Sequence, residues 1–292
     1  MKGCLILLFF NNYNNMNTNI LQFIFLIIFS SLLFSCTDDN DVQINPLDGY
    51  TKLNEGYALG AKAKVELWGQ KNFFMGYNKL IAVVYDSLNL KEKITDAHVH
   101  FLPLMTMKMN GMTSQHSAPV EDPAEEPVDD VFPGAIAFVM PSSDGGTWTL
   151  GVSVHNHKYD KEGVAKFNIT VGNPATPVMN VFTATTPDQT KLVLSLLQPS
   201  APKVGMNDIE FTIHLKETMM SWPASNDYTI EITPEMPSMG HGSPNNVNPV
   251  SSGNGHYKGK VNFTMTGEWR INVLVKKGGV PVSSGLYFDI TL

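Results

Sequence analysis

Cysteine is almost missing from this chain. The 292 residues include two cysteines, Cys4 and Cys36. We expect Cys4 to leave with an N-terminal export signal and Cys36 to carry lipid, so the mature protein would have no disulfide and no free thiol. Its folding must then rest on core burial. A blue-copper electron-transfer site, which needs a thiolate ligand, is also excluded.

Positive charge and catalytic motifs are scarce as well. The formal net charge is −7 and no basic patch is visible, which argues against a nucleic-acid partner. The sequence has no nucleophile elbow, no His-Glu-x-x-His and no phosphate loop. Its carboxylates lie mostly in tethers and inserts, so no acid–base pair stands out. We therefore expect a protein that is not an enzyme.

The first 36 residues differ from the rest of the chain. Residues 20–34 are an almost unbroken apolar run. A transmembrane helix needs about 20 apolar residues, so the run fits the core of a secretory signal better, although an uncleaved N-terminal helix is the alternative. The stretch from Leu33 to Cys36 resembles a lipobox, in which a small residue precedes the acylated cysteine. We therefore expect a signal peptide at 1–35, lipidation of Cys36 and a polar tether at 36–55.

Beyond residue 50 the chain repeats itself. The aligned blocks are 74–85 with 203–214, 98–105 with 229–236, 132–140 with 257–265, Trp148 with Trp269, and 164–171 with 286–292. Five blocks in the same order predict two copies of one domain. We place the copies at 56–172 and 177–292, because the boundary stretch Gly172-Asn173-Pro174-Ala175-Thr176-Pro177 has the composition of a linker.

Within each copy the segments are short and extended. Residues 261–265 and 269–273 alternate apolar and polar side chains, which is the period of a half-buried strand. Glycine-rich turns separate such segments, and long helical periodicity is missing. The pattern predicts an all-β protein with two tandem immunoglobulin-like β-sandwich domains. We expect Trp148 and Trp269 to fill the space between the sheets of their sandwiches.

Methionine is abundant, and it is clustered. Of the 15 methionines, 13 would survive removal of the signal. The first cluster comprises Met105, Met107, Met109, Met112 and His116, and the second comprises Met236, Met239, His241 and His256. Both begin just after a shared proline, at Pro103 and Pro234. Thioether sulfur is soft and suits Cu(I), and imidazole suits both copper oxidation states, so we predict a copper ion as the cofactor, with Cu(I) favoured.

Simpler interpretations compete with metal binding for some of these residues. Period-two spacing of Met105, Met107 and Met109 also fits one buried strand face. Met140 and Met265 alternate with phenylalanines, which favours the core. The loop around His241 is too polar and glycine-rich for a core. The remaining histidine pairs, His98 with His100 and His155 with His157, are more typical of surface or hydrogen-bonded core histidines than of ligands.

One run of short motifs stands out in the second copy: Pro234-Glu235-Met236, Met239-Gly240-His241, Tyr257-Lys258-Gly259, Phe263-Thr264-Met265, Gly267 and Trp269. By these motifs the second copy resembles the YtkA-like and FixH-like β-sandwich domains. The first copy departs from this pattern, with a longer loop, an acidic insert at 121–130 and no Met-Gly-His-Gly. Such domains are associated with copper handling in bacterial envelopes, so the resemblance implies that activity here.

These observations lead to one expected function and one alternative. We expect a non-enzymatic copper-binding lipoprotein of the cell envelope, on the periplasmic or cell-surface face of the outer membrane. It would act as a copper chaperone, buffer or delivery factor, with a copper-receiving envelope protein as a possible partner. The alternative is a surface-exposed tandem immunoglobulin-like interaction or adhesion module that needs no metal.

Overall fold

The structure is a computed structural model that describes residues 45–109, 111–185 and 189–292. The expected signal peptide and the lipidation site at Cys36 lie outside the described residues. No helix in the described ranges is long and apolar enough to span a bilayer. One boundary is corrected: strand β1 already begins at Thr51, so residues 51–55 are not tether. Four of the five are polar because they lie on an edge strand, where Lys52 bonds Glu55 and Glu66, and Leu53 packs against the core.

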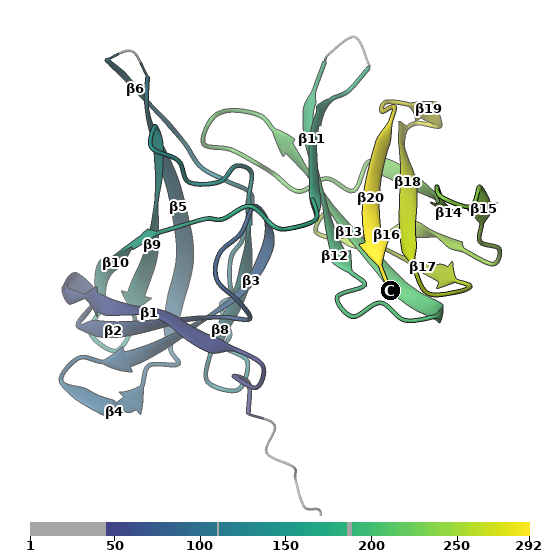
Figure 1. Ribbon diagram of the computed structural model, residues 1–292. Helices are drawn as coiled ribbons and strands as arrows, with labels where there is room; N and C mark the ends of the chain where they lie inside the picture. The colour runs from purple at the N-terminus through teal and green to yellow at the C-terminus, as the bar shows by residue number, and fades with distance from the viewer. Residues whose placement is uncertain (1–44, 110, 186–188) are drawn as a thin grey trace, which may run out of the picture. The chain divides into compact units, whose positions relative to one another are not determined.

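The first sandwich consists of two antiparallel sheets (Figure 1). In the first sheet the order is β1 (Thr51–Ala58), β2 (Ala63–Gly69), β3 (Gly76–Asp86), β8 (Phe132–Phe138) and β7 (Val120–Glu121), and β4 (Asn89–Lys93) pairs with β3. In the second sheet the order is β10 (Lys161–Ile169), β9 (Gly146–Asn156), β5 (Ala97–Met109) and β6 (Met112–His116). A short 3-10 turn, η2 (Leu59–Ala61), joins β1 to β2.

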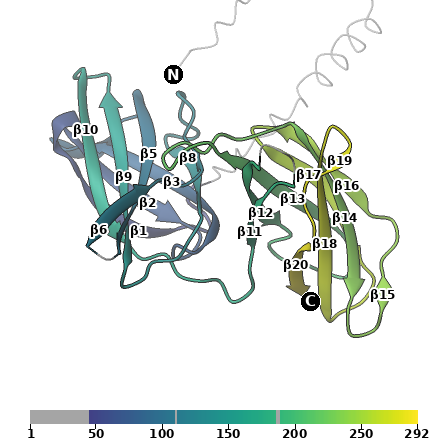
Figure 2. The ribbon, with the colours of Figure 1, turned by 90° about the horizontal axis from the view of Figure 1, so that it is seen from above.

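The second sandwich has the same plan. Its first sheet runs β11 (Met179–Thr183), β12 (Lys191–Gln198), β13 (Gly205–Lys216), β17 (His256–Phe263) and β16 (Val247–Gly253). Its second sheet runs β15 (His241–Gly242), β14 (Tyr228–Met236), β18 (Glu268–Lys277) and β19 (Val280–Pro281), and β20 (Leu286–Thr291) pairs with β18. In the view from above, β14 and β18 run side by side, as β5 and β9 do in the first sandwich (Figure 2). The predicted all-β architecture of tandem sandwiches is confirmed.

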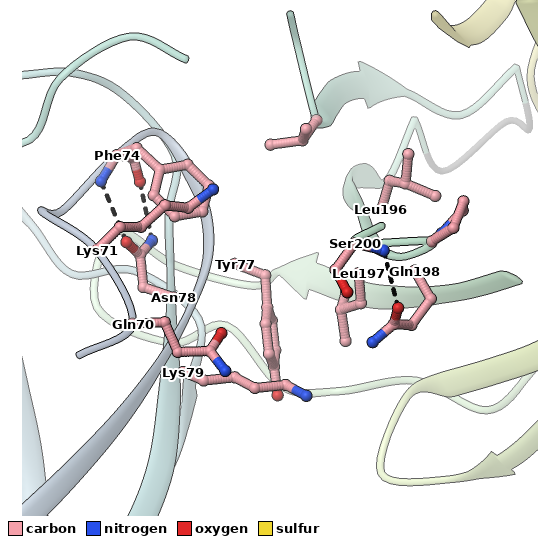
Figure 3. A pocket seen from close by; sticks show the side chains of 12 residues that line it. Gln70, Lys71, Phe74, Tyr77, Asn78, Lys79, Leu196, Leu197, Gln198 and Ser200 are labelled. Atoms are coloured by element: carbon pink, nitrogen blue, oxygen red, sulfur yellow. Dashed lines mark hydrogen bonds between the residues drawn. The ribbon is translucent and has the colours of Figure 1, made fainter. Parts of the chain in front are cut away.

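The internal repeat extends to single side chains. Asn78 accepts a hydrogen bond from the Phe74 amide at 3.1 Å and donates to the Phe74 carbonyl at 2.8 Å (Figure 3). Asn207 makes the same two bonds to Lys203, at 3.0 and 2.7 Å. Both asparagines occupy matching positions in the aligned sequence blocks. The repeat is therefore conserved between the two copies in backbone conformation as well as in sequence pattern.

Each sandwich encloses its own apolar core. The two cores consist of the inward-facing side chains of the strands. In β2, for example, every second residue is buried. Trp148 and Trp269 are each 1% exposed and belong to the first and second core. Each indole N–H donates to a carbonyl oxygen 3.0 Å away, that of Met140 for Trp148 and that of Met265 for Trp269. The tryptophans thus fill the cores and also fix the methionines that precede them.

Candidate metal centre

The hairpin formed by β5 and β6 brings together two predicted ligands of the first sandwich. Met105 and His116 are directly opposite each other in the antiparallel pairing. Side chains at such positions point to the same face with their Cβ atoms about 5 Å apart. Both are buried, with Met105 1% and His116 4% exposed. The hairpin therefore presents a thioether and an imidazole to the same part of the sandwich interior.

A third donor comes from the loop after β8. The sulfur of Met140 lies 3.1 Å from Nε2 of His116. The other ring nitrogen, Nδ1, lies 2.7 Å from the carbonyl oxygen of Ser117. A carbonyl oxygen can only accept, so Nδ1 carries the proton and donates it. Nε2 then presents its lone pair to a thioether that has no proton to offer. The thioether sulfur is a soft donor and the imidazole nitrogen also suits copper, so this contact places two candidate metal donors side by side.

The protonation state of His116 suits metal binding. Burial lowers the pKa of its imidazole, and this effect outweighs the opposing hydrogen bond to Ser117. The ring is accordingly neutral at neutral pH, which is the form that binds metals. A backbone carbonyl that fixes the tautomer is the outer partner that metal-binding histidines usually have.

Trp148 and Gly146 enclose this donor set. The Trp148 ring meets His116 edge-on, with centroids 5.3 Å apart. A Cβ atom at Gly146 would lie 2.5 Å from Cε of Met105 and 3.5 Å from its sulfur. The Met105 thioether therefore lies directly against the bare backbone of β9. Met105, His116 and Met140 converge beside one tryptophan.

The second sandwich repeats the layout in a more open form. Met236 is opposite His241 in the β14–β15 pairing, and Met265 packs at the edge of the core just before Trp269. A Cβ atom at Gly267 would lie 2.7 Å from Cε of Met236, as at Gly146 in the first copy. Here the imidazole is exposed, and its ring centroid is 6.4 Å from that of Trp269. The equivalent residues are present, and the histidine lies nearer to solvent.

Several predicted ligands are not part of either cluster. Met239 lies in the β14–β15 turn and is 62% exposed, Met112 is 73% exposed, and Met107 packs against the first core. The side chain of Met109 lies outside the described residues. Met140 and Met265 pack against their cores, as their alternation with phenylalanines favoured. Met140 also contacts His116, which the sequence did not predict. In both copies the carbonyl of this methionine accepts the indole N–H of the following tryptophan.

His256 is placed away from the methionines. It begins β17, in the sheet that does not contain β14. Its Nδ1 lies 2.8 Å from a carboxylate oxygen of Glu210, and its Nε2 lies 3.0 Å from one of Glu121. The hydrogen bond that His256 donates to the Glu121 carboxylate is the largest of the effects that raise the pKa of His256. Both ring nitrogens are therefore used in ion pairs, and the structure does not bring this residue to the Met236 cluster.

The cavity drawn in Figure 3 has a different chemistry. It has a volume of about 270 Å³ and is lined by residues such as Phe74, Tyr77 and Leu196. Neither methionine nor histidine is among its lining residues. This cavity therefore offers neither a thioether nor an imidazole to a metal ion.

Comparison with known proteins finds a family match for one part of the chain. Residues 186–274 match the family model described as YtkA-like, and this range contains Met236, His241, Met265 and Trp269. Among solved structures, the chain is similar to a conserved domain protein from Bacillus anthracis, with 11% identity, 80% of each chain covered and a TM-score of 0.31. It is also similar to red sea bream transglutaminase, with 11% identity, 75% of this chain and 29% of that chain covered, and a TM-score of 0.20. No curated protein matches.

Proposed function

We propose that this chain binds Cu(I) through two methionines and one histidine in each sandwich. The ligands would be Met105, His116 and Met140 in the first sandwich, and Met236, His241 and Met265 in the second. The observation that carries the proposal is the 3.1 Å approach of the His116 Nε2 lone pair to the Met140 sulfur. Neither atom has a proton to share once Ser117 holds the proton on Nδ1.

The donor set favours a soft, singly charged ion. Two thioethers and one neutral imidazole bring no negative charge, so a divalent ion would be poorly compensated in a buried site. Thioether ligands select Cu(I) over harder metals. The tryptophan beside each cluster has an electron-rich ring face, which attracts a cation lying within about 6 Å of the ring centroid. Because Nε2 is already unprotonated, binding at neutral pH would not have to displace a proton from His116.

The two sites would differ in how readily they exchange metal. In the first, Met105 and His116 are both buried, which favours retention. In the second, His241 is exposed, and the exposed Met239 lies in the adjoining turn. An exposed ligand can pass its metal to another protein by ligand exchange. We propose that the chain is a copper chaperone, buffer or delivery factor, held in the cell envelope by lipid on Cys36, and that it is not an enzyme.

Anaerobic Cu(I) titration of the purified chain against a competing chromophoric chelator tests the proposal. We expect two equivalents per chain. The double variant Met105→Leu/Met140→Leu should lose one equivalent, with affinity at that site falling by more than the roughly 10–100-fold that follows loss of an outer partner. Leucine keeps the volume of methionine, so the cost in stability should stay below about 1.5 kcal/mol.

The matched control is Met112→Leu, which changes a methionine of the same hairpin that is 73% exposed. It should leave both equivalents unchanged. Binding no tighter than about micromolar, roughly −8 kcal/mol, would contradict copper handling. So would a Met105→Leu/Met140→Leu variant that binds as the parent does.

A further inference from the structure

A group of three histidines lies in the first sandwich, away from the cluster of Met105, His116 and Met140. His98 on β5 and His155 on β9 are opposite each other, and His157 follows in the turn after β9. One ring nitrogen from each residue lies within 4.8 Å of the other two. His98 precedes Met105 by seven residues on the same strand, a separation of about 23 Å at 3.3 Å per residue. This cluster is therefore a separate site from the methionine cluster.

Carboxylates hold two of the rings from outside. The Asp96 carboxylate lies 2.6 Å from Nδ1 of His157, and the Asp160 carboxylate lies 3.3 Å from Nε2 of His155. The other ring nitrogen, Nε2 of His157 and Nδ1 of His155, is left for another partner. Within the described part of the chain, His98 has no hydrogen-bond partner for either ring nitrogen. A carboxylate behind a histidine is the arrangement that orients imidazoles for metal binding.

The backbone fixes the turn that carries His157. The His157 amide donates to the Asp96 carbonyl at 3.3 Å, and the Asp160 amide donates to the His157 carbonyl at 3.2 Å. Asn156, which is fully buried, donates to the Ala61 carbonyl at 2.9 Å. The ring centroid of His157 lies 4.5 Å from that of His98 and 4.9 Å from that of His155. These bonds thus hold the turn that brings His157 beside His98 and His155.

We infer that His98, His155 and His157 form a binding site for a divalent transition-metal ion. Imidazole suits Cu²⁺ and Zn²⁺, and the order of divalent affinities puts Cu²⁺ above Zn²⁺. Three nitrogens at 2.0–2.1 Å from a tetrahedral ion are about 3.3 Å apart, so small side-chain rotations close the observed cluster around a metal. The rings are half-buried, which leaves a fourth position open to water. Asp96 and Asp160 supply the negative charge that the methionine site lacks.

Electron paramagnetic resonance of the full chain with one equivalent of Cu²⁺ tests the site. We expect a spectrum with nitrogen hyperfine splitting from imidazole ligands. His98→Ala/His157→Ala should abolish this signal and weaken Cu²⁺ binding by at least about 100-fold, and Asp96→Asn, a positioning residue, should weaken it by about 10–100-fold. Zn²⁺ competition against a chromophoric chelator provides the second arm, with weaker binding but the same dependence on the variants.

The control is His100→Ala, on the same strand and bonded to Asp122 at 3.2 Å. It should leave the spectrum unchanged. A parental spectrum in the His98→Ala/His157→Ala variant, or its loss in His100→Ala, would overturn the inference. Circular dichroism at each step confirms that the variants are folded. The inference does not depend on the Cu(I) proposal, because Met105→Leu/Met140→Leu should retain the Cu²⁺ spectrum whether or not it changes Cu(I) binding.

Discussion

Lowering the pH from 7 to 4.5 is expected to destabilise this protein by about 2 kcal/mol through one residue, His214. This residue lies on β13 and is 1% exposed, and neither of its ring nitrogens has a hydrogen-bond partner in the described structure. Burial lowers the pKa of the imidazole to about 4, against a weaker opposing effect of the Glu121 carboxylate. The native state therefore holds His214 neutral where an exposed histidine would be charged.

The sign follows from proton uptake. Below a pH of about 6.5 the unfolded chain protonates His214, but the native chain does not until the pH reaches about 4. The stabilisation is complete above pH 6.5 and is lost as the pH falls through this window. The lowered pKa of His116 acts in the same direction. The raised pKa of His256 gives a contribution that is already complete below pH 6.5, and Asp86, with a pKa of about 2, titrates below the window.

Urea unfolding at pH 7.0 and 4.5 measures the effect. His214→Phe keeps an aromatic ring at the position and removes the ionisable group, so its loss of unfolding free energy between the two pH values should be less than half that of the parent. His241→Ala, which removes an exposed histidine, should behave as the parent does. An undiminished loss in His214→Phe would show that other groups cause the acid sensitivity.

The fold was largely predictable because the sequence contains two copies of the same domain. Strand alternation and five repeated blocks predicted the tandem sandwiches, and β3 with β13 and β8 with β17 occupy equivalent sheet positions. The boundary at residue 55 was wrong because an exposed edge strand and a solvated tether share the same polar composition. Amino-acid composition indicates how deeply a segment is buried, and few residues of the edge strand β1 are buried.

The sites were harder to predict because they depend on register. Met105 meets His116 only through the pairing of β5 with β6, and a shift of one residue would send one of them to the opposite face. The same holds for His98 and His155, which are 57 residues apart in the sequence and were predicted as ordinary histidines. His256 was attractive because it precedes a matching tyrosine, but β17 places it in the other sheet. Sequence proximity to a cluster does not imply spatial proximity in a sandwich.

Trp148→Ala is expected to cost about 3–5 kcal/mol of unfolding free energy, the range for removing a large aromatic side chain from a core. Trp148 is 1% exposed and contacts Phe138, with ring centroids 5.0 Å apart. Chemical denaturation provides the measurement. Trp269→Ala in the second sandwich is the matched comparison and should have a cost of similar size.

Trp148→Phe separates packing from positioning. Phenylalanine fills much of the same volume but cannot donate to the Met140 carbonyl, a bond of 3.0 Å in the native protein. The expected cost of that bond is only about 1 kcal/mol. The loop that carries Met140 would nevertheless lose its anchor, so Cu(I) affinity of the first site should fall while the second site is unchanged. Trp269→Phe should produce the reverse pattern through Met265. If Trp148→Phe weakens both sites equally, or neither, the tryptophan serves the core alone and does not position the thioether.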